Sequence, residues 1–223
     1  PTPRSIALPR SRCCRRPHNA TTSPQLGDVG LTGLTLTTKV KFASLTSEAG
    51  ILIADAIAGR LAGMSSRAPS ATVIMAVADH IGLVTFTDPP PPNVWLDITV
   101  RMPTTAAGAI VGSWQPAETA DTVRTVTNMS DVENSLAAQD VRVGAGTNPS
   151  GGQALEVQYV GIYNRVFSDG EVAAQRTAPD YATAYSFWVF YDAGGGVLAV
   201  RDASGNGRVP TLNGGTVTAN GPV

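Results

Sequence analysis

The sequence predicts an all-β protein, either a sandwich or a barrel, and three observations support this. Its apolar residues occur in short stretches, and several of these alternate with polar residues at the two-residue period of a half-buried strand. Turn signals rich in glycine and proline separate the stretches, and one short segment has the pattern of a helix. The charged fraction of 15% is low for a protein of long helices, and 223 residues suit one β domain with short extensions.

The first half of the chain contains a close succession of expected strands. Residues 34–42 alternate apolar and polar side chains, with one slip near Thr38. Residues 49–63 fit a strand pair or a short helix, and their three glycines favour strands with turns. The prolines of 89–92 cannot donate ladder hydrogen bonds, so they predict a loop at the edge. Further strands are expected at 71–78, 82–86 and 94–100.

The second half continues the series of short strands and contains the one expected helix. Strands are predicted at 109–114, 121–127, 140–143 and 155–165. In the last of these, alternation places Val157, Tyr159, Gly161 and Tyr163 on one face and Val160 and Ile162 on the other. Ser168 and Glu171 have the spacing of a capping box, which predicts a short helix over 168–176.

The segment Leu155 to Glu171 reads LEVQYVGIYNRVFSDGE, an apolar strand that ends in Tyr-Asn-Arg and leads into a serine and an acidic turn. This segment resembles the closing strand of laminin G-like and concanavalin A-like jelly rolls. The matching residues are Ile162, Tyr163, Asn164, Arg165, Phe167, Ser168 and Glu171. Residues 34–42, Trp95 and 141–144 are similar to other pieces of that family in the same order, although its Tyr-Val-Asp-Gly hairpin is missing here. The resemblance implies a two-sheet antiparallel jelly-roll sandwich with structural roles for the matching residues.

The chain is expected to have an extended basic arm at 1–28, a sandwich at 29–178 and further strands at 179–223. The C-terminal strands either complete the sandwich or pack on a neighbouring subunit. Five arginines precede the first acidic residue, Asp28: Arg4, Arg10, Arg12, Arg15 and Arg16. Such an arm can contact nucleic acid, a membrane surface or an acidic neighbour. Because a nucleic-acid footprint should recur on the body, we expect the arm to lie on a partner subunit without specific nucleic-acid binding.

The stretch YSFWVFY at 185–191 is apolar on both faces of a strand. Such a strand is either buried on both sides or exposed to a partner. For a chain that works inside an assembly, the stretch predicts contacts between subunits. The residues expected to make them are Tyr185, Phe187, Trp188, Phe190 and Tyr191.

Signs of catalysis and of a bound cofactor are weak. The acidic residues are scattered, so no carboxylate pair of a glycoside hydrolase is evident, and the chain is not expected to be an enzyme. Trp95 is interpreted as a core residue. Asp202, Ser204 and Asn206 alternate oxygen side chains as calcium loops do, but the remainder of such a loop is missing. We therefore expect a side-chain-capped turn and no cofactor, with calcium as the alternative.

The layout, together with the high content of Gly, Thr and Ala, resembles minor tail proteins of long-tailed bacteriophages. The resemblance implies a structural or adhesive subunit at the tail or the surface of a virion. Its expected partners are other virion proteins, copies of itself and a glycan of the host surface. A capsid decoration protein and a carbohydrate-binding lectin module are the alternatives. No apolar run reaches the roughly 20 residues that span a bilayer, so membrane insertion is not expected.

Overall fold

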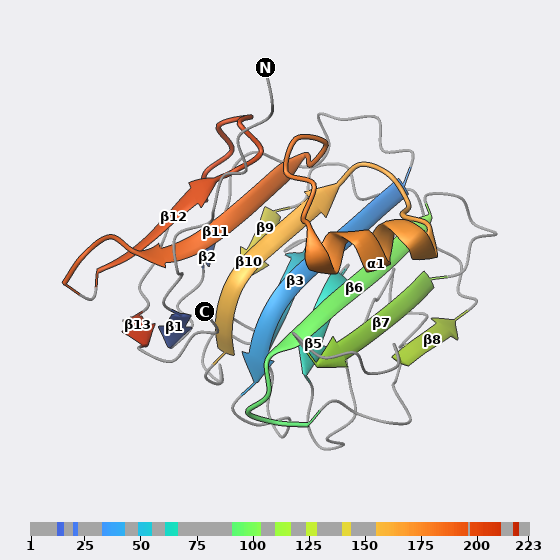
Figure 1. Ribbon diagram of the computed structural model, residues 1–223, viewed down its shortest axis with the longest axis horizontal. Coiled ribbons are helices and arrows are strands. Elements are labelled where there is room, and N and C mark those ends of the chain that lie inside the picture. Colours follow the sequence, from blue (N-terminus) through green and yellow to red (C-terminus); the bar gives the residue numbers. More distant parts are fainter. Residues whose placement is uncertain are drawn as a thin grey trace.

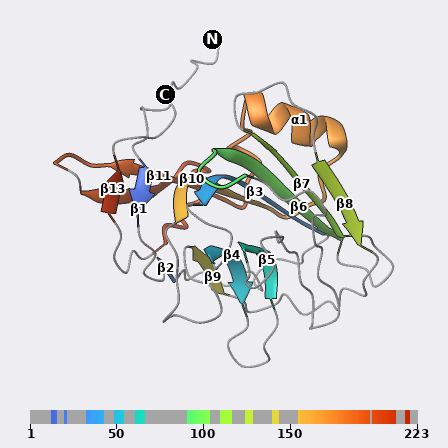
Figure 2. The same cartoon turned by 90° about the horizontal axis from the view of Figure 1, so that it is seen from below.

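The described residues form a sandwich of two antiparallel sheets with a helix on the outside (Figure 1). The computed structural model describes residues 13–15, 20–21, 33–42, 49–54, 61–66, 91–103, 110–116, 124–128, 140–143, 155–195, 197–210 and 216–218. Figure 2 shows the larger sheet lying over the smaller one, with helix α1 (Asp169–Thr177) on the far side of the larger sheet.

The larger sheet has seven strands in the order β12-β11-β10-β3-β6-β7-β8, and all its pairs are antiparallel. Strands β3 and β10 lie near its middle and are long, which suits strands that are paired on both sides. The seven strands are β3 (Gly33–Phe42), β6 (Leu96–Pro103), β7 (Ile110–Pro116), β8 (Arg124–Asn128), β10 (Leu155–Tyr163), β11 (Ser186–Asp192) and β12 (Leu198–Asp202).

The smaller sheet has four strands in the order β2-β9-β4-β5. They are β2 (Ala20–Thr21), β9 (Asp140–Val143), β4 (Ala49–Ala54) and β5 (Leu61–Ser66). The chain passes from β3 in the larger sheet to β4 and β5 in the smaller one, back to β6, β7 and β8, and then through β9 to β10. This alternation between facing antiparallel sheets makes the protein a jelly-roll sandwich, as the sequence predicted.

The core between the sheets is formed by the inner face of the larger sheet. Cross-strand partners share a face, so the register assigns alternate residues of each strand to this side. Nearly all of these residues are aliphatic or aromatic and are buried. They are Leu34, Leu36, Val40, Leu96, Ile98, Val100, Trp114, Val157, Val160, Ile162, Trp188 and Phe190.

A second apolar cluster lies on the outer face, beneath helix α1. Tyr159 stacks on Phe187 with ring centroids 5.1 Å apart, and Tyr163 packs against Phe167 at 4.5 Å. Val172 is the apolar residue by which the helix joins this cluster. Burial of these rings and aliphatic groups, worth about 1.5–3 kcal/mol for each large side chain, therefore holds the helix against the sheet.

Residues 49–63 and β10 form strands, as the sequence predicted, but one side chain of β10 lies on the opposite face of the sheet from the one predicted. Residues 49–63 form the strand pair β4 and β5, and the strands expected at 71–78 and 82–86 lie outside the described residues. In β10, Val157 pairs with Val40 but Tyr159 pairs with Lys39, so the register shifts at Gln158. This bulge turns Val157 to the inner face, beside Val160, whereas simple alternation had placed it with Tyr159.

Both predicted extensions contribute strands that pair within the chain. In the range 1–28, β1 (Cys13–Arg15) pairs with β13 (Thr216–Thr218), and β2 pairs with β9. Of the two alternatives for the C-terminal strands, β11 and β12 adopt the first, because they extend the larger sheet beyond β10.

The aromatic strand β11 is buried by its own chain. It lies between β10 and β12, and Phe187, Trp188 and Phe190 are at most 3% exposed. These three residues therefore cannot be the contacts between subunits that the sequence suggested. Their burial comes from the sandwich core on one face and the α1 cluster on the other, while Tyr185 and Tyr191 are half-buried.

The close contact at Gly161 yields a test of this packing. A Cβ atom at Gly161 would lie 2.5 Å from Thr37 Oγ1 and 3.0 Å from the ring of Phe187. We predict that Gly161→Ala lowers the free energy of unfolding by about 1–3 kcal/mol, because neither neighbour can move freely in the core. Gly170→Ala is the control, since no atom lies within 4 Å of its added methyl group. Equal denaturation midpoints for Gly161→Ala and the wild type would contradict the packing.

Candidate functional site

The outer face of the larger sheet, which we define as the face that carries helix α1, is polar over β3, β6 and β7. Rows of cross-strand partners follow one another along these strands: Thr35 with Arg101, Thr37 with Thr99, and Lys39 with Asp97. Strand β7 adds Ser113 beside Thr99 and Gln115 beside Asp97. Several of these polar side chains are buried, which on a sheet face requires hydrogen-bonding partners above them.

A single hydroxyl group ties the start of helix α1 to this face. Thr35 Oγ1 donates a hydrogen bond to the carbonyl oxygen of Arg165 at 2.7 Å and accepts one from the backbone N–H of Phe167 at 3.0 Å. Thr35 is fully buried in the central strand β3. The connection from β10 to the helix therefore runs along a fixed path over the sheet.

The helix begins at the capping box that the sequence predicted. The hydroxyl of Ser168 accepts from the N–H of Glu171, and the carboxylate of Glu171 accepts from the N–H of Ser168. Arg165 pairs with the same carboxylate and lies over the ring of Phe167. The hydrogen bond from the Ser168 backbone, and then the one from Arg165, lower the pKa of Glu171 from 4.5 to about 2.

Two further residues of the family motif, Tyr163 and Asn164, lie where strand β10 ends. The hydroxyl of Tyr163 donates to the carbonyl oxygen of Asp180 at 3.2 Å and accepts from Gln175 Nε2. Burial raises the pKa of Tyr163, so the phenol stays protonated. Asn164 is half-buried next to it. Arg165, Ser168 and Glu171 thus bind backbone and one another at the start of α1, and Tyr163 contacts Gln175 and Asp180 at its other end.

The last turn of the helix reaches over the polar rows. Arg176 Nη1 donates to Gln115 Oε1 at 2.8 Å, and Asp97 lies near enough to favour the charged guanidinium. Burial has the larger effect and lowers the pKa of Arg176. Asp97 also accepts a long hydrogen bond of 3.4 Å from the hydroxyl of Tyr159, whose pKa is raised by burial and then by Asp97.

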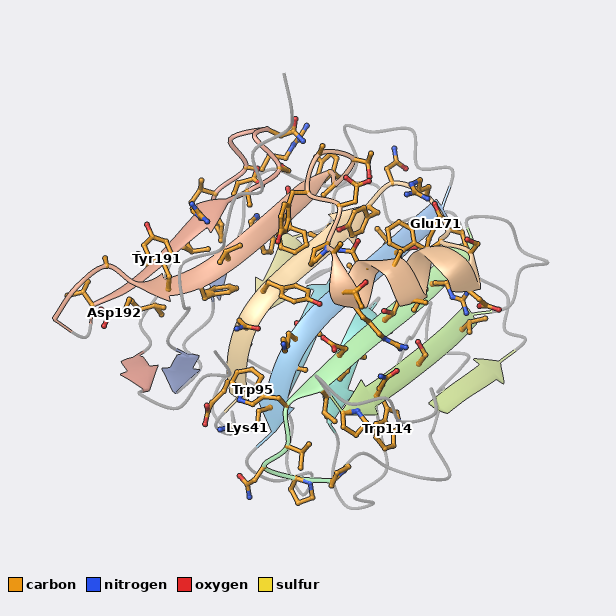
Figure 3. The ribbon with its side chains drawn as sticks, in the orientation of Figure 1. Lys41, Trp95, Trp114, Glu171, Tyr191 and Asp192 are labelled. Atoms are coloured by element: carbon orange, nitrogen blue, oxygen red, sulfur yellow. The ribbon has the colours of Figure 1, made fainter. Side chains whose placement is uncertain are left out.

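Trp95 lies on the outer face at the start of β6, and the interpretation as a core residue was wrong. Nζ of Lys41 lies 5.3 Å from the centre of the Trp95 ring and 2.9 Å from Glu156 Oε2. Figure 3 shows Trp95 and Lys41 side by side, far from Glu171 at the start of the helix. Trp95 is half-buried, because Leu96 and not Trp95 is the first β6 residue that faces the inner core.

The predicted turn at Asp202 is tightly hydrogen-bonded. Asp202 Oδ1 accepts from the N–H groups of Phe187 and Ser204 and from the hydroxyl of Ser204, and Oδ2 accepts from the N–H of Arg208. Asn206 Nδ2 donates to the carbonyl oxygens of Ala184 and Tyr185. These are the contacts of a side-chain-capped turn, which joins the end of β12 to the start of β11.

The sequence-predicted site residues therefore do not form one site. Of the five arginines, Arg15 lies in β1 opposite Thr216, and Arg4, Arg10, Arg12 and Arg16 lie outside the described residues. Sequence reasoning missed Ser113, Gln115 and Arg176. In the sequence, Ser113 and Gln115 are the polar residues on either side of Trp114, and Arg176 is a cation in the last turn of the predicted helix. Only the folded structure shows that these residues lie close together.

Within the part of the chain that the structure describes, no three or more His, Cys, Asp or Glu side chains are grouped as metal ligands. In the same residues, no helix has the length and apolar character to cross a membrane.

The comparisons with known proteins add little to these observations. No protein-family model matches the chain, and no curated protein matches it. One similar solved structure is the native heptameric SAP-like pentraxin from Limulus polyphemus, with 8% sequence identity and a TM-score of 0.43. The match covers 88% of each chain. The assignment of a jelly-roll sandwich rests on the strand order of the two sheets.

The contacts of Arg165 predict a structural role. Replacing it with alanine removes the ion pair with Glu171 and the packing on Phe167, and should lower the free energy of unfolding by about 1 kcal/mol. Glu171→Gln in the same background should add little, because the glutamine oxygen can still accept from the N–H of Ser168 and the cationic partner is already gone. Chemical denaturation measures both effects. Normal stability with loss of glycan or receptor binding per folded molecule would reverse the assignment.

Proposed function

We propose that the chain is a non-enzymatic structural and adhesive subunit of a bacteriophage virion, in the tail or tail tip. The proposal rests on the resemblance of the sequence to minor tail proteins and on the structural contacts that the carboxylates of the sandwich make. Its partners would be other virion proteins, copies of itself and a glycan of the host surface.

One observation supports the structural part of this proposal. The carboxylates of the described residues form ion pairs with cations and accept hydrogen bonds from backbone N–H groups. Glu156 and Asp169 pair with Lys41 and Arg101, and Glu171 caps the helix. Asp202 holds a turn through four hydrogen bonds, and Asp192 accepts from the N–H of Gly194 at 2.8 Å. Carboxylates that hold backbone and cations favour a scaffold over general acid and base chemistry, which requires a matched pair at a cleft.

The basic segment supports an assembled state. Five arginines precede Asp28, and formal charge over the remaining residues is negative, so the segment suits an acidic surface of a neighbouring subunit. Within this segment, β1 (Cys13–Arg15) pairs with β13 and β2 (Ala20–Thr21) pairs with β9 of the same chain. The arginines therefore support the assembly proposal, whereas Phe187, Trp188 and Phe190 of the aromatic strand are buried within the chain.

A lectin module is the second candidate, and Trp95 favours it. An aromatic ring that is half-buried on a polar sheet face is a common element of sites for small polar ligands. The two candidates are compatible, since an adhesive virion protein can bind a host glycan. A glycan array separates a pure scaffold from a lectin, and fractionation of particles separates tail from capsid decoration.

The arginines provide the direct test. Replacing Arg4, Arg10, Arg12, Arg15 and Arg16 together with glutamine should leave the sandwich folded and reduce incorporation into particles by about tenfold or more. The matched variant with five lysines keeps the charge and should incorporate normally. Incorporation is measured by mass spectrometry of purified particles from the phage that encodes the chain. Absence of the wild-type chain from particles overturns the virion role, and normal incorporation of the glutamine variant overturns the role of the arm.

A further inference from the structure

The turn at 202–208 contains a chemically labile step of the chain, in which Gly207 follows Asn206. Asparagine deamidates spontaneously when the backbone nitrogen of the next residue attacks its side-chain amide carbon. Glycine hinders this attack least, because it has no side chain and the widest choice of backbone angles. Both residues are exposed, so water can reach the step. Deamidation is therefore chemically favoured at this pair of residues.

The turn requires both residues in this order. Gly207 has a φ of 71°, in the left-handed region that an L side chain rarely adopts. The amide nitrogen of Asn206 donates to two carbonyl oxygens, that of Ala184 at 3.0 Å and that of Tyr185 at 3.2 Å. An ionised aspartate could only accept hydrogen bonds at this position. The labile pair is thus a structural requirement of the turn.

The same two hydrogen bonds oppose the reaction. They hold the amide nitrogen, which is the leaving group, against residues 22 and 21 positions earlier in the chain. Attack by the nitrogen of Gly207 makes the amide carbon tetrahedral and then expels the amide nitrogen, so the side chain has to leave both carbonyls. Two hydrogen bonds of ordinary strength reduce the population of the released side chain by about tenfold or more.

Asp202 keeps the turn closed around this side chain. Its carboxylate accepts hydrogen bonds from three backbone N–H groups, those of Phe187, Ser204 and Arg208. The hydroxyl of Ser204, which also donates to this carboxylate, accepts from the N–H of Asn206 at 3.3 Å. The backbone before and after Asn206 is therefore fixed by one carboxylate, and loss of its contacts should free the amide.

We propose that Asn206 is a deamidation site that the closed turn protects. When the turn opens, the backbone nitrogen of Gly207 loses its proton to hydroxide and bonds to the amide carbon. The amide nitrogen takes up a proton from water and leaves as ammonia, so the product is a cyclic imide. Water then adds to one of the two imide carbonyls and breaks a C–N bond, which gives aspartate or isoaspartate. Water and hydroxide are the only reagents that the step needs.

The reaction leaves the turn open. The new carboxylate cannot donate to the carbonyls of Ala184 and Tyr185, and it lies in the same turn as the carboxylate of Asp202, so the two like charges repel. Arg208 is a nearby cation, but its Nη1 is already held by the carbonyl oxygen of Tyr185 at 2.8 Å. Because ammonia is lost, the original contacts cannot return. Deamidation therefore opens this turn permanently.

Peptide mapping of the full-length chain by mass spectrometry, in a mildly alkaline buffer, measures the rate at each asparagine. We expect Asn206 to deamidate at least about tenfold more slowly in the native chain than in the chain unfolded in guanidinium chloride. In the unfolded chain it should react as fast as Asn213 and Asn220, which also precede glycine, and much faster than Asn93, which precedes Val94. Equal rates at Asn206 in the native and the unfolded chain, or an intact Asn206 in the unfolded chain, overturns the proposal.

Asp202→Ala tests the role of the turn. It should raise the rate at Asn206 towards the unfolded rate, while circular dichroism shows that the sandwich remains folded. Asp192→Ala is the matched control, because Asp192 also accepts from a backbone N–H in a turn, that of Gly194 at 2.8 Å, at the other end of β12. If Asp202→Ala does not fold, Ser204→Ala replaces it. An unchanged rate in the folded variant, or an equal rise in Asp192→Ala, contradicts protection by the turn.

Asn206→Asp reproduces the carboxylate of the product. The amides of 204–208 should exchange hydrogen about tenfold faster or more in this variant than in the wild type. Asn206→Ala, which loses the same two hydrogen bonds but adds no charge, should show a smaller increase. Equal exchange in the wild type and Asn206→Asp shows that the product does not hold the turn open. None of these measurements depends on incorporation into particles, so the virion function is tested separately.

Discussion

The hydroxyl group of Thr35 fixes the outer face of the sandwich. It holds both the carbonyl oxygen of Arg165 and the N–H of Phe167, and it does so from the central strand of the larger sheet. The path of the chain out of β10 is thereby set, and with it the start of α1 at Ser168. Because a helix is rigid, fixing its start also determines where its last turn brings Arg176.

The two faces of the larger sheet differ in how they are stabilised. The inner face buries aliphatic and aromatic side chains against the smaller sheet. The hydrophobic effect that stabilises it does not depend on the direction of the contacts. The outer face combines an apolar cluster under α1 with polar rows over β3, β6 and β7. Buried polar groups need partners at fixed positions, so this face is the more specific of the two. Among the described residues, buried polar groups without a hydrogen-bond partner remain on this face at Thr37, Arg101, Ser113 and Arg176.

Most of the architecture could be predicted from local patterns, because alternation and capping are local. The strand at 140–143 and the capping box at Ser168 and Glu171 are observed as predicted. The side of Val157 could not be predicted, since a bulge depends on the register with β3. The sequence also could not show what buries the aromatic strand β11, because its apolar pattern fits burial within the chain as well as burial by a partner. The candidate site joins β6, β7 and the end of α1, so it exists only after three distant segments have met.

Hydrogen exchange of helix α1 in Thr35→Val is the most direct test of this account. Valine keeps the shape of threonine but loses both hydrogen bonds, so the amides of 172–177 should exchange about tenfold faster or more while β6 keeps its protection. Thr38→Val is the matched control, because it loses a buried hydrogen bond of the same kind, to the carbonyl oxygen of Tyr159 on the inner side. It should leave exchange in the helix unchanged. Equal exchange in the wild type and Thr35→Val, or equal acceleration in both variants, would contradict the account.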